Sequence, residues 1–371
     1  MNEQELDNYE SYARIIVIGV GGAGNNAVNR MIDENISSVE FYVANTDQQA
    51  LSRSKATNRI VLGSNVTGGL GAGGDPELGR KAAEESIDKI REVVQGANLV
   101  FIAAGMGGGT GTGAAPVIAQ AAKEAGALTV AIVTRPFTFE GKKRIANSVE
   151  GLNNLKDAVD AIIIVSNDKL LMVSGTAPIS EAFAESDRVL AQSVKTVTDL
   201  ILCPAFINLD FADVKNTLKD SGISLIGFGM GSGPNRSREA ANNAINSPLL
   251  EASINGAQRA ICAVTCGREV SLYEAQETVN RIIEAAGSSV DIKFGVSINE
   301  NLSDQIIVSV IASDFTEEFD FTHVPTYDQP IQTSETPAES GNEPIANEET
   351  EKEANSEKES FLPNFLKDKN L

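Results

Sequence analysis

The stretch "GMGGGTGTG", Gly105–Gly113, follows the apolar run "NLVFIAA" and holds six glycines in nine residues. Glycine inside an element costs roughly 0.5–1 kcal/mol relative to alanine, and one reason for such a cluster is a ligand that the backbone must approach closely. The stretch leads into "AAPVIAQAAKEAG", so that Thr110 and Thr112 lie at the start of a helix. A helix start presents free N–H groups that bind anions. The pattern therefore indicates that the backbone binds a phosphate group.

Two further glycine loops extend this pattern. "GVGGAGNNAVNRM" contains Gly19-x-Gly21-x-x-Gly24, and Asp47 stands where a ribose-binding acid of a dinucleotide site would be expected. A third loop, "GGLGAGGDPE", spans residues 68–77. A nicotinamide- or flavin-binding oxidoreductase would account for the loop that contains Gly19, Gly21 and Gly24 but would leave the loop after Gly105 without a function. Three loops instead suggest a phosphate chain held from several sides, and the missing lysine excludes a P-loop.

The elements that would position these loops alternate between strands and helices. The apolar runs "RIIVIGV", "EFYVANT", "RIVLG", "LVFIAAG", "LTVAIVT" and "AIIIVSN" are separated by helix-length segments such as "DPELGRKAAEESIDKIREVVQG". This order predicts an α/β fold with a parallel sheet covered on both faces. Ligands of such folds bind at the carboxyl ends of the strands, where the glycine loops lie. The runs "SLIGFGM", "RAICAVT", "SVDIKFGVSI" and "QIIVSVIA" predict a smaller α/β domain with a mixed sheet over 221–312.

Composition narrows the classes of protein that fit. A chain of 371 residues can form two domains with their own cores. It has no apolar run near the ~18 residues of a membrane span and begins without a basic, apolar leader, so we expect a cytoplasmic protein without direct membrane insertion. A net charge of −21 argues against a nucleic-acid surface. Three cysteines without a C-x-x-C pair, Cys203, Cys262 and Cys266, are expected to be buried thiols, and we assign no role to His323.

Six motifs in order give a resemblance to a known family: "GVGGAGNNAVNRM", "NTDQQAL", "GLGAGGDPE", "GGGTGTG", "RPFTFEGKKR" and "NLDFADVK". From about Ala13 to Ala312 the chain resembles the FtsZ branch of the tubulin/FtsZ family, bacterial cell-division GTPases that polymerise head to tail in the cytokinetic ring at mid-cell. The resemblance implies bound GTP or GDP with Mg²⁺ and no metal site of the protein's own. It implies the following organisation: an N-terminal arm (1–12), a GTP-binding domain (13–178), a long central helix (179–202), and a C-terminal α/β domain (203–315) whose acid loop is 203–213.

The resemblance also implies which residues contact the nucleotide. Phe183 would lie against the guanine, and Asp187 would accept hydrogen bonds from two guanine donors where adenine offers one donor and an acceptor, which would select GTP. As sequence, Glu140 and Arg144 could equally be a surface ion pair, and Phe183 a core residue. The implied nucleotide-binding residues are Gly22, Ala23, Gly24, Asn25, Asn26, Thr46, Gly71, Ala72, Gly73, Gly108, Gly109, Thr110, Gly111, Glu140, Arg144, Phe183 and Asp187.

The acids of "NLDFADVK" follow the central helix, whereas the base-contacting residues begin it. From Phe183 to about Ile201 is ~28 Å along a helix, so neither Asp210 nor Asp213 can reach the nucleotide of its own chain. If they take part in hydrolysis, as the resemblance implies, they act from a neighbouring subunit, with Asn208 supporting the geometry. Two alternatives stay open: the acids are a helix N-cap and first-turn acid, or the protein is a nucleotide-gated scaffold in which they are inert.

The C-terminal part changes composition twice. Residues 316–360 carry thirteen acidic residues against two lysines and few large apolar side chains, which predicts a disordered linker. The following "FLPNFLKDKNL", 361–371, is apolar again and resembles the family's docking peptide. The resemblance implies that it binds division adaptors and membrane-tethering proteins, with a frayed terminus as the alternative. Lys367 stands where relatives often have arginine.

Overall fold

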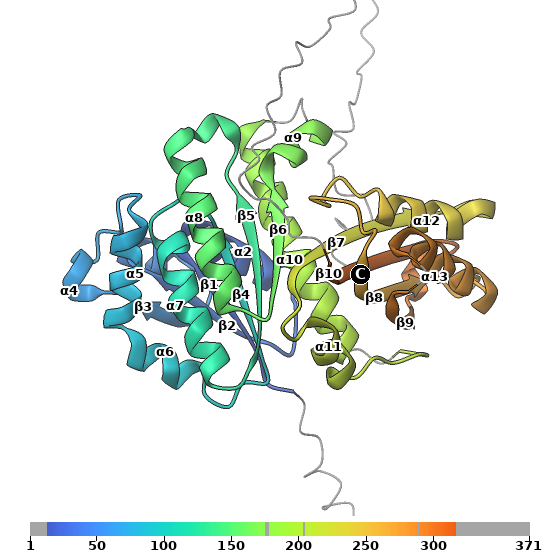
Figure 1. Cartoon of the computed structure of the whole chain (residues 1–371), viewed down its shortest axis with the longest axis horizontal. Coiled ribbons are helices and arrows are strands. Elements are labelled where there is room, and N and C mark those ends of the chain that lie inside the picture. The colour runs from blue at the N-terminus through green and yellow to red at the C-terminus, as the bar shows by residue number, and fades with distance from the viewer. Residues whose placement is uncertain (1–12, 175–177, 203–204, 288, 317–371) are drawn as a thin grey trace, which may run out of the picture.

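A computed structural model describes residues 13–174, 178–202, 205–287 and 289–316 (Figure 1). The expected N-terminal arm, the acidic linker and the docking peptide lie outside the described residues, as do Cys203 and His323.

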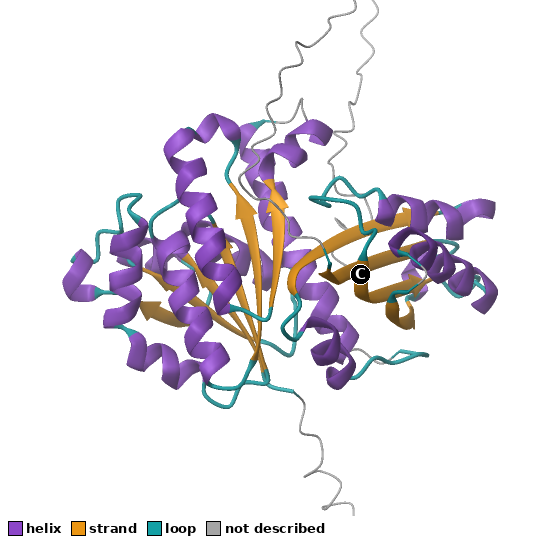
Figure 2. Cartoon of the chain, in the orientation of Figure 1, coloured by secondary structure: helices purple, strands orange, loops and turns teal. Residues whose placement is uncertain are grey.

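The N-terminal domain alternates strands and helices as the sequence predicts (Figure 2). Each of the six predicted runs forms a strand, whereas the predicted helical segment after Asp75 forms two helices that meet at Ser86. In chain order the elements are β1 (Ile15–Val20), α2 (Gly21–Asp33), β2 (Glu40–Asn45), α3 (Gln48–Arg53), β3 (Asn58–Val61), α4 (Ser64–Thr67), α5 (Pro76–Glu85), α6 (Ile87–Val94), β4 (Leu99–Gly105), α7 (Thr110–Glu124), β5 (Leu128–Arg135), η1 (Thr138–Glu140), α8 (Lys142–Ala158), β6 (Ala161–Ser166) and α9 (Asn167–Ser174).

The long helix α10 leads from this domain into the C-terminal part of the chain. The remaining elements are α10 (Ile179–Leu202), α11 (Phe211–Leu218), β7 (Gly222–Gly231), η2 (Gly233–Asn235), α12 (Arg236–Ile245), β8 (Ala257–Cys266), α13 (Leu272–Ala286), β9 (Asp291–Ile298), η3 (Glu300–Leu302) and β10 (Ile306–Phe315).

The strands form one sheet in the order β3-β2-β1-β4-β5-β6-β7-β10-β8-β9. Strands β1 to β7 pair parallel with one another, β10 pairs antiparallel with both β7 and β8, and β8 pairs parallel with β9. The mixed C-terminal sheet that the sequence predicts is thus confirmed, and β7 joins it to the parallel sheet. The order of the strands reverses between β1 and β4, and ligands of open α/β sheets bind at such a switch point.

The two faces of the parallel sheet are covered by different helices. Alternate residues of a strand point to opposite faces: Ile15 and Val17 of β1 belong to one apolar cluster, and Ile16 and Ile18 to another. The first cluster includes residues of α2 and α10, and the second includes residues of α5 to α8. Since all four side chains are at most 1% exposed, each contributes about 1.5–3 kcal/mol by burial.

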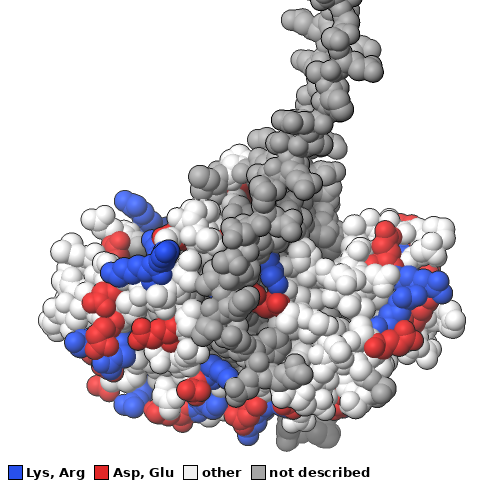
Figure 3. Space-filling view, turned by 45° about the horizontal axis from the view of Figure 1, so that its top comes forward, with Lys and Arg blue, Asp and Glu red and all other residues white. Residues whose placement is uncertain are grey.

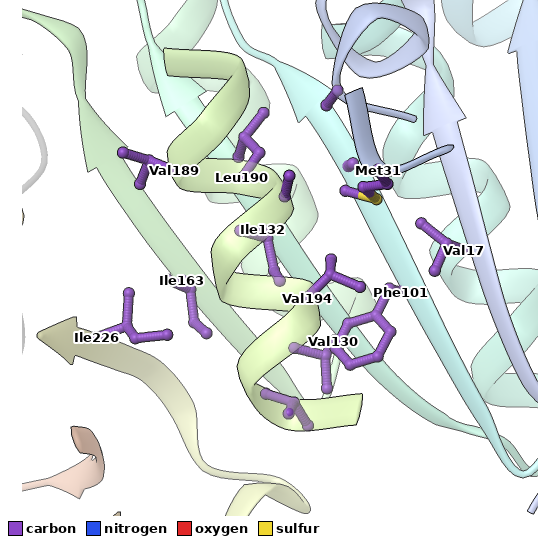
Figure 4. Close-up of a cluster of buried hydrophobic side chains, with 14 of the residues drawn as sticks. Val17, Met31, Phe101, Val130, Ile132, Ile163, Val189, Leu190, Val194 and Ile226 are labelled. Atoms are coloured by element: carbon purple, nitrogen blue, oxygen red, sulfur yellow. The ribbon is translucent and has the colours of Figure 1, made fainter. Parts of the chain in front are cut away.

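Helix α10 packs lengthwise on the parallel sheet. Val189, Leu190 and Val194 are fully buried against strand residues that include Val130 and Ile163 (Figure 4). The same apolar cluster continues into Val214 and Leu218 of α11. A helix of 24 residues is about 36 Å long, so α10 connects two distant ends of the molecule.

The C-terminal domain has its own core. Apolar residues of β7, β8 and β10 pack against α12 and α13, and this cluster includes Cys262 and Cys266. Both thiols are buried and free, as the sequence predicts, and burial raises the pKa of the Cys262 thiol to about 12.

Candidate nucleotide-binding site

Two of the glycine loops, the one that contains Gly21 and the one that follows Gly105, meet at the switch point of the sheet. Gly21 starts α2 directly after β1, with a φ of 72°, and a Cβ atom there would lie 2.8 Å from the backbone nitrogen of Gly111. Gly111 lies in the first turn of α7, which follows β4. Glycine is required at Gly21 both for its backbone conformation and for this close approach. The paired strands β1 and β4 therefore bring together loops that lie about 90 residues apart in the chain.

Buried polar side chains fix these loops. The hydroxyl groups of Thr46 and Thr110 are 2.6 Å apart and share a hydrogen bond. Asn25 is 3% exposed; with its amide oriented to satisfy its neighbours, it donates to the carbonyls of Gly19 and Gly21 and accepts from Asn45. The Asn25 side chain thus stabilises the loops, whereas the next residue, Asn26, is exposed.

The loop at residues 68–77 packs on the loop that follows Gly105. A Cβ atom at Gly109 would lie 2.8 Å from that of Ala72, which is itself buried. The neighbouring Gly71 and Gly73 have φ values of 93° and 56°, conformations that favour glycine. Asn147 of α8 donates to the carbonyl of Gly74 at 3.2 Å and approaches that of Gly107 at 3.4 Å.

The assembled loops leave backbone groups open to a ligand. The first N–H groups of any helix have no intrahelical acceptor. In α2 and α7 they also have no capping side chain at the N-cap position. Gly22 and Gly108 have open space where a Cβ atom would stand. Ala23 does not have a positive φ, so its side chain causes no strain there. The N-termini of α2 and α7, which meet at Gly21 and Gly111, are therefore a candidate anion site.

Aromatic rings and an acid border the site at the start of α10. Phe137 stacks on Phe139 at 4.9 Å and meets Phe183 edge-on at 5.0 Å between ring centroids. Phe183 is 42% exposed, which leaves part of its ring free for contact. One helical turn later, burial raises the pKa of the Asp187 carboxyl to about 7, partly offset by Arg30. A planar base beside a carboxylate would fit this pair.

Glu140 and Arg144 form the ion pair that the sequence left open. Glu140 also accepts a hydrogen bond from the backbone nitrogen of Phe137 at 3.0 Å, so it holds the aromatic segment in place. The Arg144 side chain is 57% exposed. The pairing itself does not test a contact of either residue with a nucleotide, and this role stays a prediction.

The acids Asp210 and Asp213 lie at the other end of α10. Asp210 is the N-cap of α11 and accepts from the backbone nitrogen of Asp213 at 2.8 Å, while Asp213 accepts from that of Asp210 at 3.4 Å. The N-cap interpretation is therefore confirmed, and a catalytic role remains compatible with it. Asn208 accepts from the backbone nitrogen of Ala205 at 2.6 Å and so shapes the loop before the acids.

Sequence reasoning missed two residues that brace the site. Asn147 joins the loop at residues 68–77 to the loop that follows Gly105, as described above. Asp168 of α9 accepts from the backbone nitrogen of Thr138 at 2.9 Å and from its hydroxyl at 2.5 Å, which anchors the aromatic segment. Asn147 and Asp168 lie in helices, outside the glycine motifs, so nothing local in the sequence points to them.

Charges and metal ligands give no competing site among the residues that the structure describes. These residues contain no group of three or more His, Cys, Asp or Glu side chains that could hold a metal ion. On the face shown in Figure 3, their basic and acidic side chains are intermixed rather than gathered into a basic surface. Among the described helices, none is long and apolar enough to cross a membrane.

The fold and the site define an α/β protein with three glycine-rich loops packed together at the switch point of a parallel sheet. The model of the Tubulin/FtsZ family, GTPase domain, matches residues 14–175, and that of the FtsZ family, C-terminal domain, matches residues 222–316. The chain therefore belongs to the tubulin/FtsZ family of cytoskeletal GTPases, in its FtsZ branch, as the sequence motifs predict.

Solved structures agree with this assignment. The structure of an empty FtsZ dimer from M. jannaschii is 39% identical, with 86% of this chain and 95% of that chain covered at a TM-score of 0.80. A tryptophan-to-tyrosine mutant of M. jannaschii FtsZ is 41% identical, with coverages of 86% and 98% and the same TM-score of 0.80. CetZ2 from Haloferax volcanii, solved as a GTPγS-bound protofilament, shares the fold at 21% identity, coverages of 81% and 92% and a TM-score of 0.69.

Proposed function

We propose that this protein binds and hydrolyses GTP and polymerises head to tail into filaments of the cytokinetic ring in bacterial cell division. The observation that carries the proposal is the separation of two half-sites along α10. The glycine loops and Phe183 lie toward the start of α10, and Asp210 and Asp213 follow its end, about 28 Å along the helix from Phe183. A GTPase site completed by the next subunit uses both halves.

In this arrangement each half has a defined chemical task. The free N–H groups of the loops bind and orient the triphosphate, which lowers the barrier by positioning and by stabilising charge. Asp210 and Asp213 of the next subunit orient the attacking water or accept its proton, and Asn208 shapes their loop. Because the contact joins two different surfaces and does not close on itself, repetition produces a filament.

Exposed apolar side chains at both ends support such a contact. Leu70, in the third glycine loop, is 85% exposed, and Phe139 beside the candidate base pocket is 61% exposed. At the other end, Phe206 in the acid loop is 79% exposed. Large apolar side chains contribute most to binding free energy when a partner covers them fully. Burial of these three residues between subunits would therefore stabilise the filament.

Mg²⁺ fits the donors around the loops. The two hydroxyl groups of Thr46 and Thr110, hydrogen-bonded at 2.6 Å, are hard oxygen donors beside the phosphate loops. Protein-bound Mg²⁺ usually takes most of its ligands from substrate phosphates and water. The ion would neutralise charge on the β- and γ-phosphates, and the loops would orient the same phosphates.

The tail adds partners to this function. The docking peptide at 361–371 would bind division adaptors and membrane-tethering proteins and place the filament at mid-cell, with no nucleic-acid partner. Its apolar residues Phe361, Leu362, Phe365 and Leu366 suit burial by a folded adaptor.

Phosphate release measured against protein concentration tests the proposal. Specific activity is expected to rise cooperatively with concentration and to follow the sedimented fraction, because each site needs a neighbour. An activity that is constant from high dilution upward would contradict a shared site, and filaments without phosphate release would favour the scaffold alternative. Binding of NADH or ATP in preference to GTP would favour an unrelated enzyme.

A further inference from the structure

Helix α11, which begins with the acid pair, is held at its C-terminal end by side chains of both domains. Its eight residues make it about 12 Å long, and a helix this short depends on tertiary contacts for its position. The carbonyls at its end lack intrahelical donors. Two of them, those of Asn216 and Thr217, accept hydrogen bonds from side chains of other elements, whereas that of Leu218 accepts from Ser221 in the following turn. The contacts from other elements hold the end of α11 opposite Asp210 and Asp213.

The N-terminal domain supplies Lys123, in the last turn of α7. Its ammonium group donates to Asp220 Oδ1 at 3.2 Å and to the carbonyl of Val159 at 3.1 Å, and it lies 3.6 Å from Asp160 Oδ1. Asp220 follows the C-cap residue Lys219 of α11 and has a left-handed φ of 49° in the turn that ends the helix. The side chain of Asp160 is 6% exposed and also accepts from the backbone nitrogen of Thr129.

The C-terminal domain supplies Arg259 of β8 and Ser313 of β10. Arg259 Nη1 donates to the carbonyl of Asn216 at 2.5 Å and to that of Lys219 at 3.3 Å. Its Nε donates to Asp314 Oδ2 at 3.0 Å, which fixes the guanidinium group. The Ser313 hydroxyl donates to the carbonyl of Thr217 at 3.1 Å. Arg259 thus lies at the negative end of the α11 dipole, and Lys123 holds the Asp220 side chain in the turn after it.

We propose that Lys123 and Arg259 are positioning residues for hydrolysis, acting through the acid pair at the opposite end of α11. This inference rests on the proposed function, in which Asp210 and Asp213 complete a neighbour's site. Lys123 has a second link, because α7 begins at Thr110 in the phosphate loop and ends at the α11 anchor. Helix α7 therefore runs from the phosphate loop of a subunit to the anchor of the acids that the same subunit would present to the next nucleotide.

The expected size of the effect follows from exposure. The side chains of Lys123 and Asp220 are 35% and 63% exposed, and exposed ion pairs contribute little because water screens them. This ion pair therefore shifts the equilibrium between the anchored and the unanchored position of α11 by a factor of about five at most. Displacement of a reacting group by about 1 Å can lower a rate by up to a hundredfold, but the α11 core contacts of Val214 and Leu218 remain in a variant. We therefore expect threefold to fivefold losses of turnover, with little effect on stability.

The experiment compares Lys123→Met and Asp220→Asn with Lys123→Arg and with Arg91→Met in the full chain. Arg91 pairs with Glu124 at 3.4 Å, also at the end of α7, but does not contact α11 among the interactions described. Three quantities are measured: phosphate release per sedimented subunit, the GTP dissociation constant of the monomer, and the melting temperature. Lys123→Met and Asp220→Asn should lower phosphate release threefold to fivefold with GTP affinity unchanged, and Lys123→Arg and Arg91→Met should retain it.

A second arm measures Lys123→Met and Arg259→Met alone and in an Asp210→Asn/Asp213→Ala background, in which both acids are removed and the N-cap of α11 is kept. If the anchors act through the acids, each change lowers turnover of the otherwise unchanged chain, and neither lowers the residual rate of the background without acids. Equal losses in both backgrounds, or full turnover of Lys123→Met and Asp220→Asn, would overturn the positioning role. If the chain without both acids keeps full activity, the proposed function fails, and this outcome is distinct from failure of the anchors.

Discussion

Asp187 is the ionisable residue of the candidate site whose pKa is raised by burial. Burial raises the pKa of its carboxyl to about 7, and Arg30 opposes this shift. Its unfolded value is near 3.9, so the folded chain binds this proton more tightly than the unfolded chain does. The contribution to stability is complete below about pH 4 and is lost as the pH rises through 7. Without nucleotide, Asp187→Asn should therefore flatten the fall of the melting temperature between pH 4 and 7.

Guanine binding should depend on the same titration with the opposite sign. In the proposed site the ionised carboxylate would accept hydrogen bonds from the two guanine donors, whereas the protonated form would lose an acceptor. We expect the GTP affinity of the monomer to weaken by up to about tenfold per pH unit below pH 7, measured by equilibrium titration from pH 8 to 5.5. Asp47→Asn, at an acid that caps α3, serves as a control. A pH-independent affinity would show that Asp187 does not ionise on binding guanine.

Base selectivity provides an independent test of Asp187. Asp187→Ala removes an acceptor that matches guanine better than adenine, so GTP binding should weaken and the preference over ATP should narrow by about tenfold or more. Competition between the two nucleotides on the monomer measures this ratio. Unchanged discrimination would remove Asp187 from the base-binding site.

At the scale of elements, the start of α11 combines a structural and a proposed chemical role. Asp210 caps the helix and Asp213 completes the reciprocal hydrogen bonds. Asparagine caps about as well as aspartate, whereas alanine costs about 1 kcal/mol. Comparing the two substitutions at Asp210 therefore separates the cap from the charge.

We expect Asp210→Asn, Asp210→Ala and Asp213→Ala to bind GTP almost normally, because the acids lie at the far end of α10 from the loops. Phosphate release per assembled subunit should fall by about a hundredfold, the size of a general-base contribution. If Asp210→Asn keeps full activity while Asp210→Ala loses it, the role of Asp210 is structural. Loss of GTP binding by any of these monomers would contradict the separation of the half-sites.

At the scale of the whole molecule, the folded domains and the tail should be separable. Burying each large apolar side chain of the docking peptide contributes about 1.5–3 kcal/mol, while the linker, with a net charge of −11 over 316–360, is repelled by an anionic membrane. Deleting 361–371 should leave GTP hydrolysis and sedimentation intact and abolish recruitment to adaptor-loaded vesicles. A matched chain with Lys367→Arg should be recruited. Polymerisation that fails after the deletion, or recruitment that survives it, would disprove the tail assignment.

The sequence by itself determined the strands, the α/β class and the family. Apolar runs bounded by glycine predict strands from local information, and the ten predicted runs all form strands. Glycine is likewise a local signal, because a positive φ such as that of Gly21 or Gly107 disfavours a side chain regardless of the rest of the fold. The glycine loops could therefore be located before the structure was known.

Only the tertiary structure decided how these pieces meet. The hydrogen bond between Thr46 and Thr110 joins residues 64 positions apart, and the contact of Lys123 with Asp220 joins residues 97 apart. Ser86, where α5 and α6 meet, likewise has a distant partner, since its hydroxyl accepts from the backbone nitrogen of Gly63. Such contacts depend on strand order and on which face of the sheet each helix covers. No local pattern encodes them, because the free energy that selects them is that of the whole packed core.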